Sequence, residues 1–347
     1  MTQRWDSPKG QVAFGLRLRR SLLPYHRGYA SFFAPCLAPK SPLANSQLYS
    51  ATAPKGSIPK DEPACLILCG PTGTGKSELA LLLAQKVGAE IISADAFQFY
   101  RGLDIGTAKP TLRERQEVPH HLIDCLSPEE KANAHWYARK VRSLIPEIMG
   151  RGNVPLIVGG SGLYIKAVLE WFFEVPDQAE IMKIRKELES LTPEEMYRYV
   201  TQYDPESARR IHPNDTYRLR RALEVYYATG KPISLLQRDN ALFPYPFYLL
   251  AIYRTREELY RRIEERVEQI FASGFPEEVE NLKQKYDFSL PAFEAIGYRE
   301  TADYLSGEMS LDRTKELIKQ KIRNYAKRQM TWFRKDKRIL WLNLGSP

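Results

Sequence analysis

Long apolar runs and zinc-binding cysteine spacings are both missing from this chain of 347 residues. No stretch reaches the roughly 18 apolar residues that a membrane-spanning helix needs, and the longest apolar runs have the length of strands. The four cysteines, Cys36, Cys65, Cys69 and Cys125, occur at no zinc-ligand spacing. We therefore expect a globular protein with no membrane span and no structural metal. The cysteine usage favours a reducing, cytoplasmic compartment.

Acidic residues are nearly absent from the first 60 positions, which carry nine Lys or Arg against the single acid Asp6. This segment supplies +8 of the formal net charge of +9, so the rest of the chain is almost neutral. The global charge is therefore weak evidence for nucleic-acid binding. We expect residues 1–60 to be a basic, disordered leader. The alternatives are a transit peptide, which would place the protein in a plastid or mitochondrion, and upstream sequence from a wrongly assigned start.

Short apolar runs alternate with helical patterns from residue 64 onward. Strands are expected at 64–69, 90–95, 154–158 and 247–253, and helices at 78–87, 134–151, 257–272, 277–285 and 311–333. Because such alternation is typical of a parallel sheet covered by helices, the sequence predicts an α/β fold. Residues 174–215 hold charged helical segments and no strand. We expect an inserted helical domain there, between two parts of the core at 61–173 and 216–347.

A complete P-loop pattern, Gly-Pro-Thr-Gly-Thr-Gly-Lys-Ser, stands between an expected strand and an expected helix. Backbone N–H groups of such a loop surround phosphate oxygens, the lysine adds positive charge, and the hydroxyl can bind Mg²⁺. The predicted phosphate site consists of Gly70, Thr72, Gly73, Thr74, Gly75, Lys76 and Ser77, with Ser77 as the metal ligand.

A Walker-B aspartate is missing from the strand at 154–158, which runs into Gly159 and Gly160 instead. The guanine-specifying pattern Asn-Lys-x-Asp is absent from the whole chain. The diphosphate at the P-loop therefore need not belong to a nucleotide. Asp95 closes the second strand, at the sheet edge where open α/β sheets bind ligands. It is a candidate general base or indirect metal ligand, and a helix cap is the alternative.

Further polar and basic segments follow. Gln98, Tyr100 and Arg101 precede the loop 102–110, which contains Lys109, and loops at this edge commonly carry function. Three arginines, Arg218, Arg220 and Arg221, share one expected helix. Arg218 and Arg221 lie three residues apart, so both could bind one diphosphate, or they could form a solvated basic face.

The terminal helix interleaves basic residues with Tyr325, Trp332 and Phe333, which indicates either an RNA surface or a helix that packs its aromatic side chains into the core. His120 and His121 could suggest a metal site. Adjacent histidines on an extended segment point to opposite sides, so a structural role is favoured.

Together these segments resemble the bacterial-type tRNA dimethylallyltransferase family, also called isopentenyl-diphosphate:tRNA transferases. The matching stretches keep the family's order over about residues 64–335. They are the P-loop, Ser-Ala-Asp-Ala-Phe-Gln-Phe-Tyr-Arg-Gly-Leu-Asp-Ile-Gly-Thr-Ala-Lys-Pro at 93–110, Val-Pro-His-His-Leu-Ile-Asp at 118–124, Gly-Gly-Ser-Gly-Leu-Tyr at 159–164, Ile-His-Pro-Asn-Asp at 211–215, Ala-Ile-Gly-Tyr-Arg-Glu at 295–300 and Tyr-Ala-Lys-Arg-Gln-Met-Thr-Trp-Phe-Arg at 325–334.

The resemblance implies a P-loop kinase-like core and a helical insertion that binds the anticodon stem-loop. The implied reaction moves a dimethylallyl group from dimethylallyl diphosphate to N6 of adenosine 37 in tRNA, just 3′ of the anticodon, with Mg²⁺ as cofactor and a monomeric enzyme. Catalysis would rest on Asp95 and Lys76, and Arg218 and Arg221 would help the P-loop bind the diphosphate. The implied tRNA contacts are Asp95, Ala96, Phe97, Gln98, Ser161, Tyr217, Arg218, Arg220, Lys327 and Arg328.

The chain departs from the family pattern after Asp95, where Ala96 replaces a usual Ser and Phe97 and Phe99 replace smaller aliphatic residues. Three other functions stay open. An adenylate isopentenyltransferase would prenylate free AMP, ADP or ATP, a small-molecule kinase would use ATP at the P-loop, and an RNA-binding module would use neither the P-loop nor Asp95. The expected helical insertion and basic terminal helix favour tRNA over a mononucleotide.

Overall fold

The computed structural model describes residues 12–13, 64–170, 178–238 and 243–343. Most of the predicted leader, 1–60, lies outside these ranges. The chain divides into two compact units, a larger one formed by residues up to Ile165 and from Pro244 onward, and a smaller one from Lys166 to Phe243. In the described part of the chain, no helix is both long enough and apolar enough to cross a membrane.

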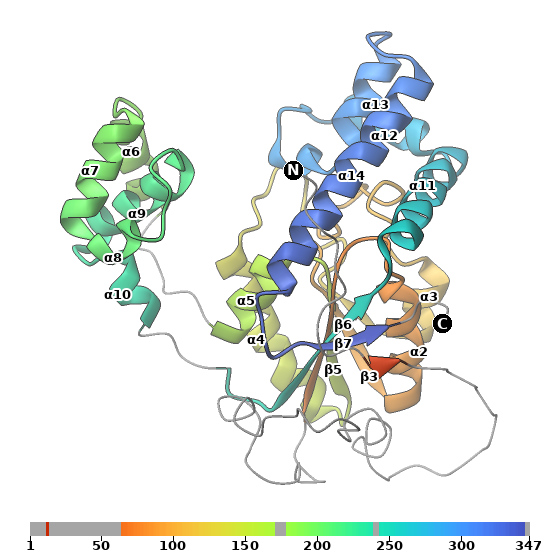
Figure 1. The fold of residues 1–347 in the computed structure, drawn as a ribbon. Coiled ribbons are helices and arrows are strands. Elements are labelled where there is room, and N and C mark those ends of the chain that lie inside the picture. The colour runs from red at the N-terminus through yellow and green to blue at the C-terminus, as the bar shows by residue number, and fades with distance from the viewer. Residues whose placement is uncertain (1–11, 14–63, 171–177, 239–242, 344–347) are drawn as a thin grey trace. The chain divides into compact units, whose positions relative to one another are not determined.

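A parallel sheet of seven strands forms the centre of the larger unit (Figure 1). Its strand order is β1-β7-β6-β2-β5-β3-β4, and every neighbouring pair is parallel. The strands are β1 Val12–Ala13, β2 Cys65–Cys69, β3 Ala89–Ser93, β4 His120–His121, β5 Val154–Gly159, β6 Phe247–Tyr253 and β7 Leu340–Asn343. The predicted α/β fold with a parallel sheet is confirmed. The short strands β1, β4 and β7 were not predicted, and they stand outside the four central strands.

Helices cover the sheet. Leu83 and Ala84 of α2 pack on a sheet face that contains Leu66, Leu68 and Leu156, while α4 lies on the opposite side (Figure 1). The helices of this part are α2 Lys76–Val87, α3 Leu112–Glu117, α4 Ala134–Gly150, α5 Gly162–Glu170, α11 Arg256–Ala272, α12 Phe275–Lys283, α13 Tyr298–Leu305 and α14 Leu311–Phe333, with a 3₁₀ turn at Pro291–Glu294. Strong helix starts explain several boundaries, as at α3, where Thr111 and Glu114 form a capping box.

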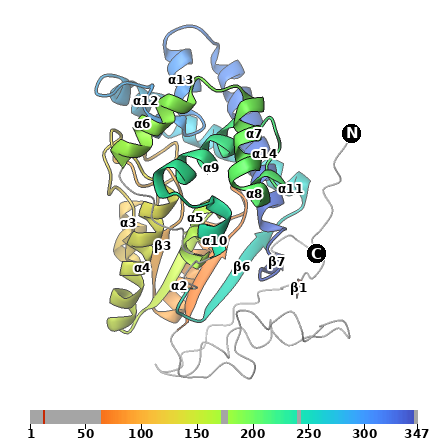
Figure 2. The same cartoon turned by 90° about the vertical axis from the view of Figure 1, so that its left-hand side faces the viewer.

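Among its described residues, the smaller unit contains helices and no strand, and it begins within α5 at Lys166. It contains α6 Gln178–Leu188, α7 Pro193–Tyr203, α8 Pro205–Ala208, α9 Thr216–Thr229 and α10 Ile233–Arg238, which group together in Figure 2. Its own core includes Leu188, Met196 and Val200, and Leu219 and Leu223 of α9 pack against them. The smaller unit runs from Lys166 to Phe243 and so includes α9, whose apolar face belongs to this core, whereas the prediction placed the insertion at 174–215.

Candidate active site

The P-loop joins β2 to α2 at the carboxyl edge of the sheet. Gly70, Gly73 and Gly75 have φ values of 130°, 81° and 90°, a region that side-chain-bearing residues rarely adopt. The Thr74 side chain is buried and donates a hydrogen bond to the Pro71 carbonyl at 2.9 Å. The backbone of the loop is therefore fixed by its glycines and by an internal hydrogen bond.

Three arginines that were not predicted as site residues contact successive residues of this loop. The Arg254 Nε atom donates to the Thr74 carbonyl at 2.8 Å, and Arg262 Nε donates to the Gly73 carbonyl at 3.0 Å. Arg266 Nη1 lies 3.3 Å from the Thr72 hydroxyl. The four-residue spacing of Arg262 and Arg266 puts both on one face of α11, which is the sequence signal that could have found them.

Arg266 differs from the other two because it forms no ion pair with any residue that the structure describes. Burial lowers its pKa, and only the charge of Asp95 acts in the opposite direction. Lys76 donates a hydrogen bond from Nζ to the Pro71 carbonyl at 2.7 Å. Its pKa is lowered to about 8 by burial and by the nearby Arg266, against a smaller opposing effect of Asp95. Two incompletely compensated cations therefore stand beside the P-loop.

Asp95 follows β3 and is half-buried. Its Oδ1 atom accepts a hydrogen bond from the Phe97 backbone N–H at 3.0 Å, which fixes the carboxylate within a tight turn. Its charge acts on the pKa values of both Lys76 and Arg266, so the three groups share one electrostatic site. Ala96 follows Asp95 in the same turn and is also half-buried.

Aromatic side chains surround the same position. Burial, together with the charge of Asp95, raises the pKa of Tyr325 to about 12, against hydrogen bonds with Ser161 and Gln329. Tyr164 stacks on Phe99 with ring centroids 5.9 Å apart, and burial and Asp95 also raise its pKa. Asp95 therefore lies in a partly apolar surrounding, close to phenols that stay protonated at neutral pH.

Helix α14 connects the P-loop with the glycine loop after β5. The Gln329 side chain accepts from the Thr72 backbone N–H at 2.9 Å and donates to the Gly160 carbonyl at 2.9 Å. A Cβ atom on Gly160 would lie 2.2 Å from Gln329 Nε2, and one on Gly162 would lie 2.3 Å from the Trp332 ring. The loop after β5 is therefore glycine-rich because α14 packs directly on it.

The terminal helix was predicted either to present an RNA surface or to pack its aromatic side chains into the core, and the charges of α14 divide into two groups. Glu268 of α11 forms ion pairs with Lys315 at 2.7 Å and Lys319 at 2.9 Å, which neutralises the first turns. Lys327 and Arg328 are exposed and form no ion pair with any described residue. The later part of this helix therefore carries positive charge that no described acid neutralises.

The remaining predicted contacts lie in the smaller unit, on α9. The Tyr217 side chain is 80% exposed. Arg218 pairs with Asp215 at 3.0 Å, and Arg221 pairs with Glu224 at 3.3 Å. Arg220 lies on the same helix and is half-buried. Because these residues belong to a separate unit, a role for Arg218 and Arg221 at the diphosphate stays a prediction.

Metal ligands of the usual kind do not gather among the described residues, where no three His, Cys, Asp or Glu side chains come together. His120 Nδ1 lies 2.7 Å from the Val118 carbonyl, and His121 Nε2 lies 2.6 Å from Glu90 Oε2, so both histidines have local structural partners. Ser77 is exposed in the first turn of α2. A single hydroxyl fits Mg²⁺, which is commonly held by few protein ligands together with substrate phosphates and water.

Two family models match segments of the chain that together contain the residues of this site. The family model described as IPP transferase matches residues 98–336, and the model described as Isopentenyl transferase matches residues 63–125. A tRNA dimethylallyltransferase of Pelotomaculum thermopropionicum is 43% identical over 290 residues, which cover 82% of this chain and 92% of the relative.

Solved structures agree. A tRNA isopentenylpyrophosphate transferase of Bacillus halodurans is 34% identical, with a TM-score of 0.61 over 82% of this chain and 91% of that one. A eukaryotic dimethylallyltransferase, solved acting on tRNA, is 29% identical, with a TM-score of 0.71 over 81% of this chain and 74% of that one. The chain belongs to the IPP transferase family.

Proposed function

We propose that this enzyme transfers a dimethylallyl group from dimethylallyl diphosphate to N6 of adenosine 37 in tRNA, and releases diphosphate. The observation that carries the proposal is the shared site of Asp95, Lys76 and Arg266 beside a P-loop that is followed by no Walker-B carboxylate. Such a site combines a base with cations for a leaving group. The similarity to tRNA dimethylallyltransferases supports tRNA as the acceptor.

The donor's diphosphate would be bound by the P-loop amides, Lys76 and Arg266. Mg²⁺, held by the Ser77 hydroxyl and the phosphate oxygens, would supply further positive charge. An allylic diphosphate ionises readily when the charge on its leaving group is neutralised. Hydrogen-bond donors and cations that are already in place before the reaction neutralise this charge without reorganisation. Arg218 and Arg221 are candidates for additional contacts to the same group.

The acceptor adenine is a poor nucleophile, and its exocyclic nitrogen must lose a proton as the new N–C bond forms. Asp95 would accept that proton, a contribution of roughly 10²- to 10⁴-fold for a positioned base. The adenine must leave its stack in the tRNA to reach Asp95. The residues proposed to contact tRNA are Asp95, Ala96, Phe97, Gln98 and Ser161 near the site, Lys327 and Arg328 on α14, and Tyr217, Arg218 and Arg220 on α9.

Donor and acceptor are tested separately. With Mg²⁺ present, dimethylallyl diphosphate should raise the thermal unfolding temperature of the protein more than ATP does at equal concentration. Labelled dimethylallyl diphosphate should then label unmodified tRNA and leave AMP unlabelled. Stabilisation by ATP alone would favour a kinase, and label on AMP would favour an adenylate isopentenyltransferase. The monomeric state and the cytoplasmic location stay predictions, the first open to light scattering.

A further inference from the structure

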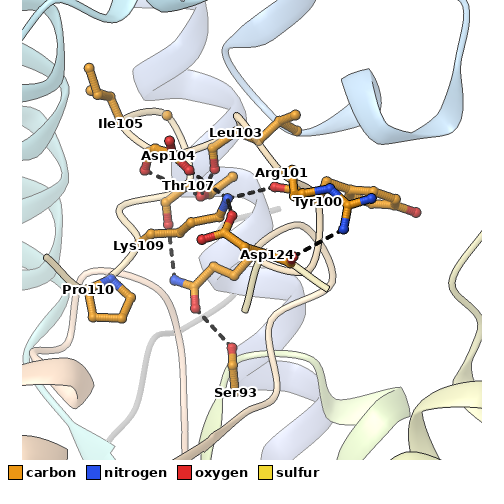
Figure 3. Close-up of polar contacts among 12 residues, drawn as sticks. Ser93, Tyr100, Arg101, Leu103, Asp104, Ile105, Thr107, Lys109, Pro110 and Asp124 are labelled. Carbon is orange, nitrogen blue, oxygen red and sulfur yellow. Dashed lines mark hydrogen bonds and ion pairs between the residues drawn. The ribbon is translucent and has the colours of Figure 1, made fainter. Parts of the chain in front are cut away.

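Lys109, in the loop 102–110, is almost fully buried although it carries a charge. Its side chain is 2% exposed, and Nζ donates to the Tyr100 carbonyl at 2.6 Å, to Asp104 Oδ1 at 2.6 Å and to Asp124 Oδ1 at 2.5 Å (Figure 3). All three ammonium hydrogens therefore have partners. Because removing a buried charge from its partners is costly, this lysine fixes three backbone segments relative to one another.

The Asp124 carboxylate connects this lysine to α3. Its Oδ2 atom accepts from Arg115 Nη1 at 2.6 Å. Burial by itself would raise the pKa of Asp124, but the hydrogen bonds from Lys109 and Arg115 outweigh burial and lower it. Ala108 and Asp124 have φ values of 49° and 54°, which non-glycine residues seldom adopt. The ion pairs thus hold a backbone that would otherwise relax.

Gln98 receives its orientation from the same loop. Its Nε2 atom donates to the carbonyls of Thr107 and Ala108, each at 3.3 Å, and its Oε1 atom accepts from the Ser93 hydroxyl at 2.9 Å. Both carbonyls directly precede Lys109 in the chain. The amide is therefore held in one orientation, with one lone pair of Oε1 left to accept a further hydrogen bond.

A second anchor holds the other end of the loop. Glu278 of α12 accepts hydrogen bonds from the backbone N–H groups of Asp104 at 3.1 Å and Ile105 at 2.6 Å, and from the Tyr298 hydroxyl at 2.7 Å. Within the loop, the Thr107 hydroxyl donates to the Leu103 carbonyl at 2.5 Å, and the Lys109 backbone N–H donates to the Asp104 carbonyl at 3.0 Å. The Lys109 ammonium adds the connection from these residues to the Tyr100 carbonyl and to Asp124, which lie outside the loop 102–110.

We propose that Lys109 is a positioning residue for tRNA recognition and that it acts through Gln98. The inference rests on the proposed role of Gln98 as a tRNA contact. Loss of the Lys109 ammonium releases the loop carbonyls, so the Gln98 amide loses its fixed orientation and binds tRNA more weakly. The diphosphate site does not depend on this loop, so binding of the donor is unaffected.

The test measures kcat and the KM values of both substrates for Lys109→Met, Gln98→Ala and the double variant. Lys109→Met should raise the KM for tRNA about five- to ten-fold, as expected for a lost hydrogen bond, and leave the KM for dimethylallyl diphosphate unchanged. The double variant should be no worse than Gln98→Ala, because both changes remove one contact. Arg113→Met, which removes a nearby exposed ion pair, is the matched control and should change neither constant.

A folding defect is separated from a positioning defect by Asp104→Asn, which weakens one ion pair of Lys109 at a side chain that is 57% exposed. This variant should unfold near the wild-type temperature and still raise the KM for tRNA about two-fold. If Gln98→Ala has no effect, the proposed tRNA contact is wrong. If Gln98→Ala weakens tRNA binding while folded Lys109→Met and Asp104→Asn do not, or if the double variant is additive, the role of Lys109 is overturned.

Discussion

At the scale of single residues, Arg266 is a cation whose charge is incompletely compensated. It touches the Thr72 hydroxyl, forms no ion pair with a described residue, and has a pKa lowered by burial. A half-buried guanidinium in this state is suited to bind the donor's diphosphate. We expect Arg266→Gln to reduce kcat/KM for dimethylallyl diphosphate on the order of 100-fold.

The matched control for Arg266 is Arg261→Gln on the same helix, because Arg261 is exposed and pairs with Glu265 away from the loop. Steady-state kinetics with saturating tRNA measures both variants. Equal losses in the two variants, or a loss in Arg266→Gln confined to the KM for tRNA, would contradict a diphosphate role.

The pKa of Lys76 predicts how the affinity for dimethylallyl diphosphate depends on pH. Its pKa in the free protein is lowered to about 8, so the amine loses its charge as pH rises above that value. Binding of a diphosphate favours the charged form, so affinity for dimethylallyl diphosphate should fall above pH 8, by up to about ten-fold per pH unit. Lys76→Arg keeps its charge and should show a flat profile from pH 7 to 10. If the affinity of the wild-type protein for dimethylallyl diphosphate did not change with pH, Lys76 would have no role in binding it.

At the scale of elements, one side chain of α14 connects the P-loop with the glycine loop after β5. Gln329 is 6% exposed and bonds to Thr72 and to Gly160. Gln329→Leu leaves the partly buried Thr72 N–H and Gly160 C=O groups without this partner, so the free energy of unfolding should fall by about 1–3 kcal/mol. Urea denaturation measures it, with the exposed Gln320→Leu of the same helix as control. An unchanged midpoint for Gln329→Leu would show that other contacts hold the loops.

The sequence predicted the elements that have strong local signals. The four central strands are apolar runs of ordinary length, and the P-loop sits between a strand and a helix as its pattern requires. β4 and β7 have only two and four residues and no such signal. In the sequence, α11 resembles any other charged helix. Its arginines could not be assigned to the P-loop because only the fold brings them close to it. The same holds for Glu268, whose ion pairs with α14 neutralise part of a surface that looked basic.

At the scale of the whole molecule, the proposed donor site belongs to the larger unit, while Tyr217 and the arginines of α9 belong to the smaller one. Aromatic side chains that stack on bases contribute about 1–3 kcal/mol each. Tyr217→Ala should therefore raise the KM for tRNA roughly five- to 100-fold and leave the KM for dimethylallyl diphosphate unchanged. Met182→Ala, at another exposed apolar side chain of this unit, is the control. If Tyr217→Ala changed only the KM for dimethylallyl diphosphate, the assignment of the smaller unit to tRNA binding would be wrong.

The most direct test of the account uses the full chain with Mg²⁺, labelled dimethylallyl diphosphate and unmodified tRNA, followed by mass spectrometry of the nucleosides. Asp95→Asn is the decisive variant, because an amide oxygen can still accept from the Phe97 N–H but cannot act as the base. We expect wild-type protein to form N6-dimethylallyladenosine and Asp95→Asn to form it roughly 10²- to 10⁴-fold more slowly, with an unchanged KM for the donor. Product formation at the wild-type rate by Asp95→Asn, or label on any other atom of the tRNA, would contradict it.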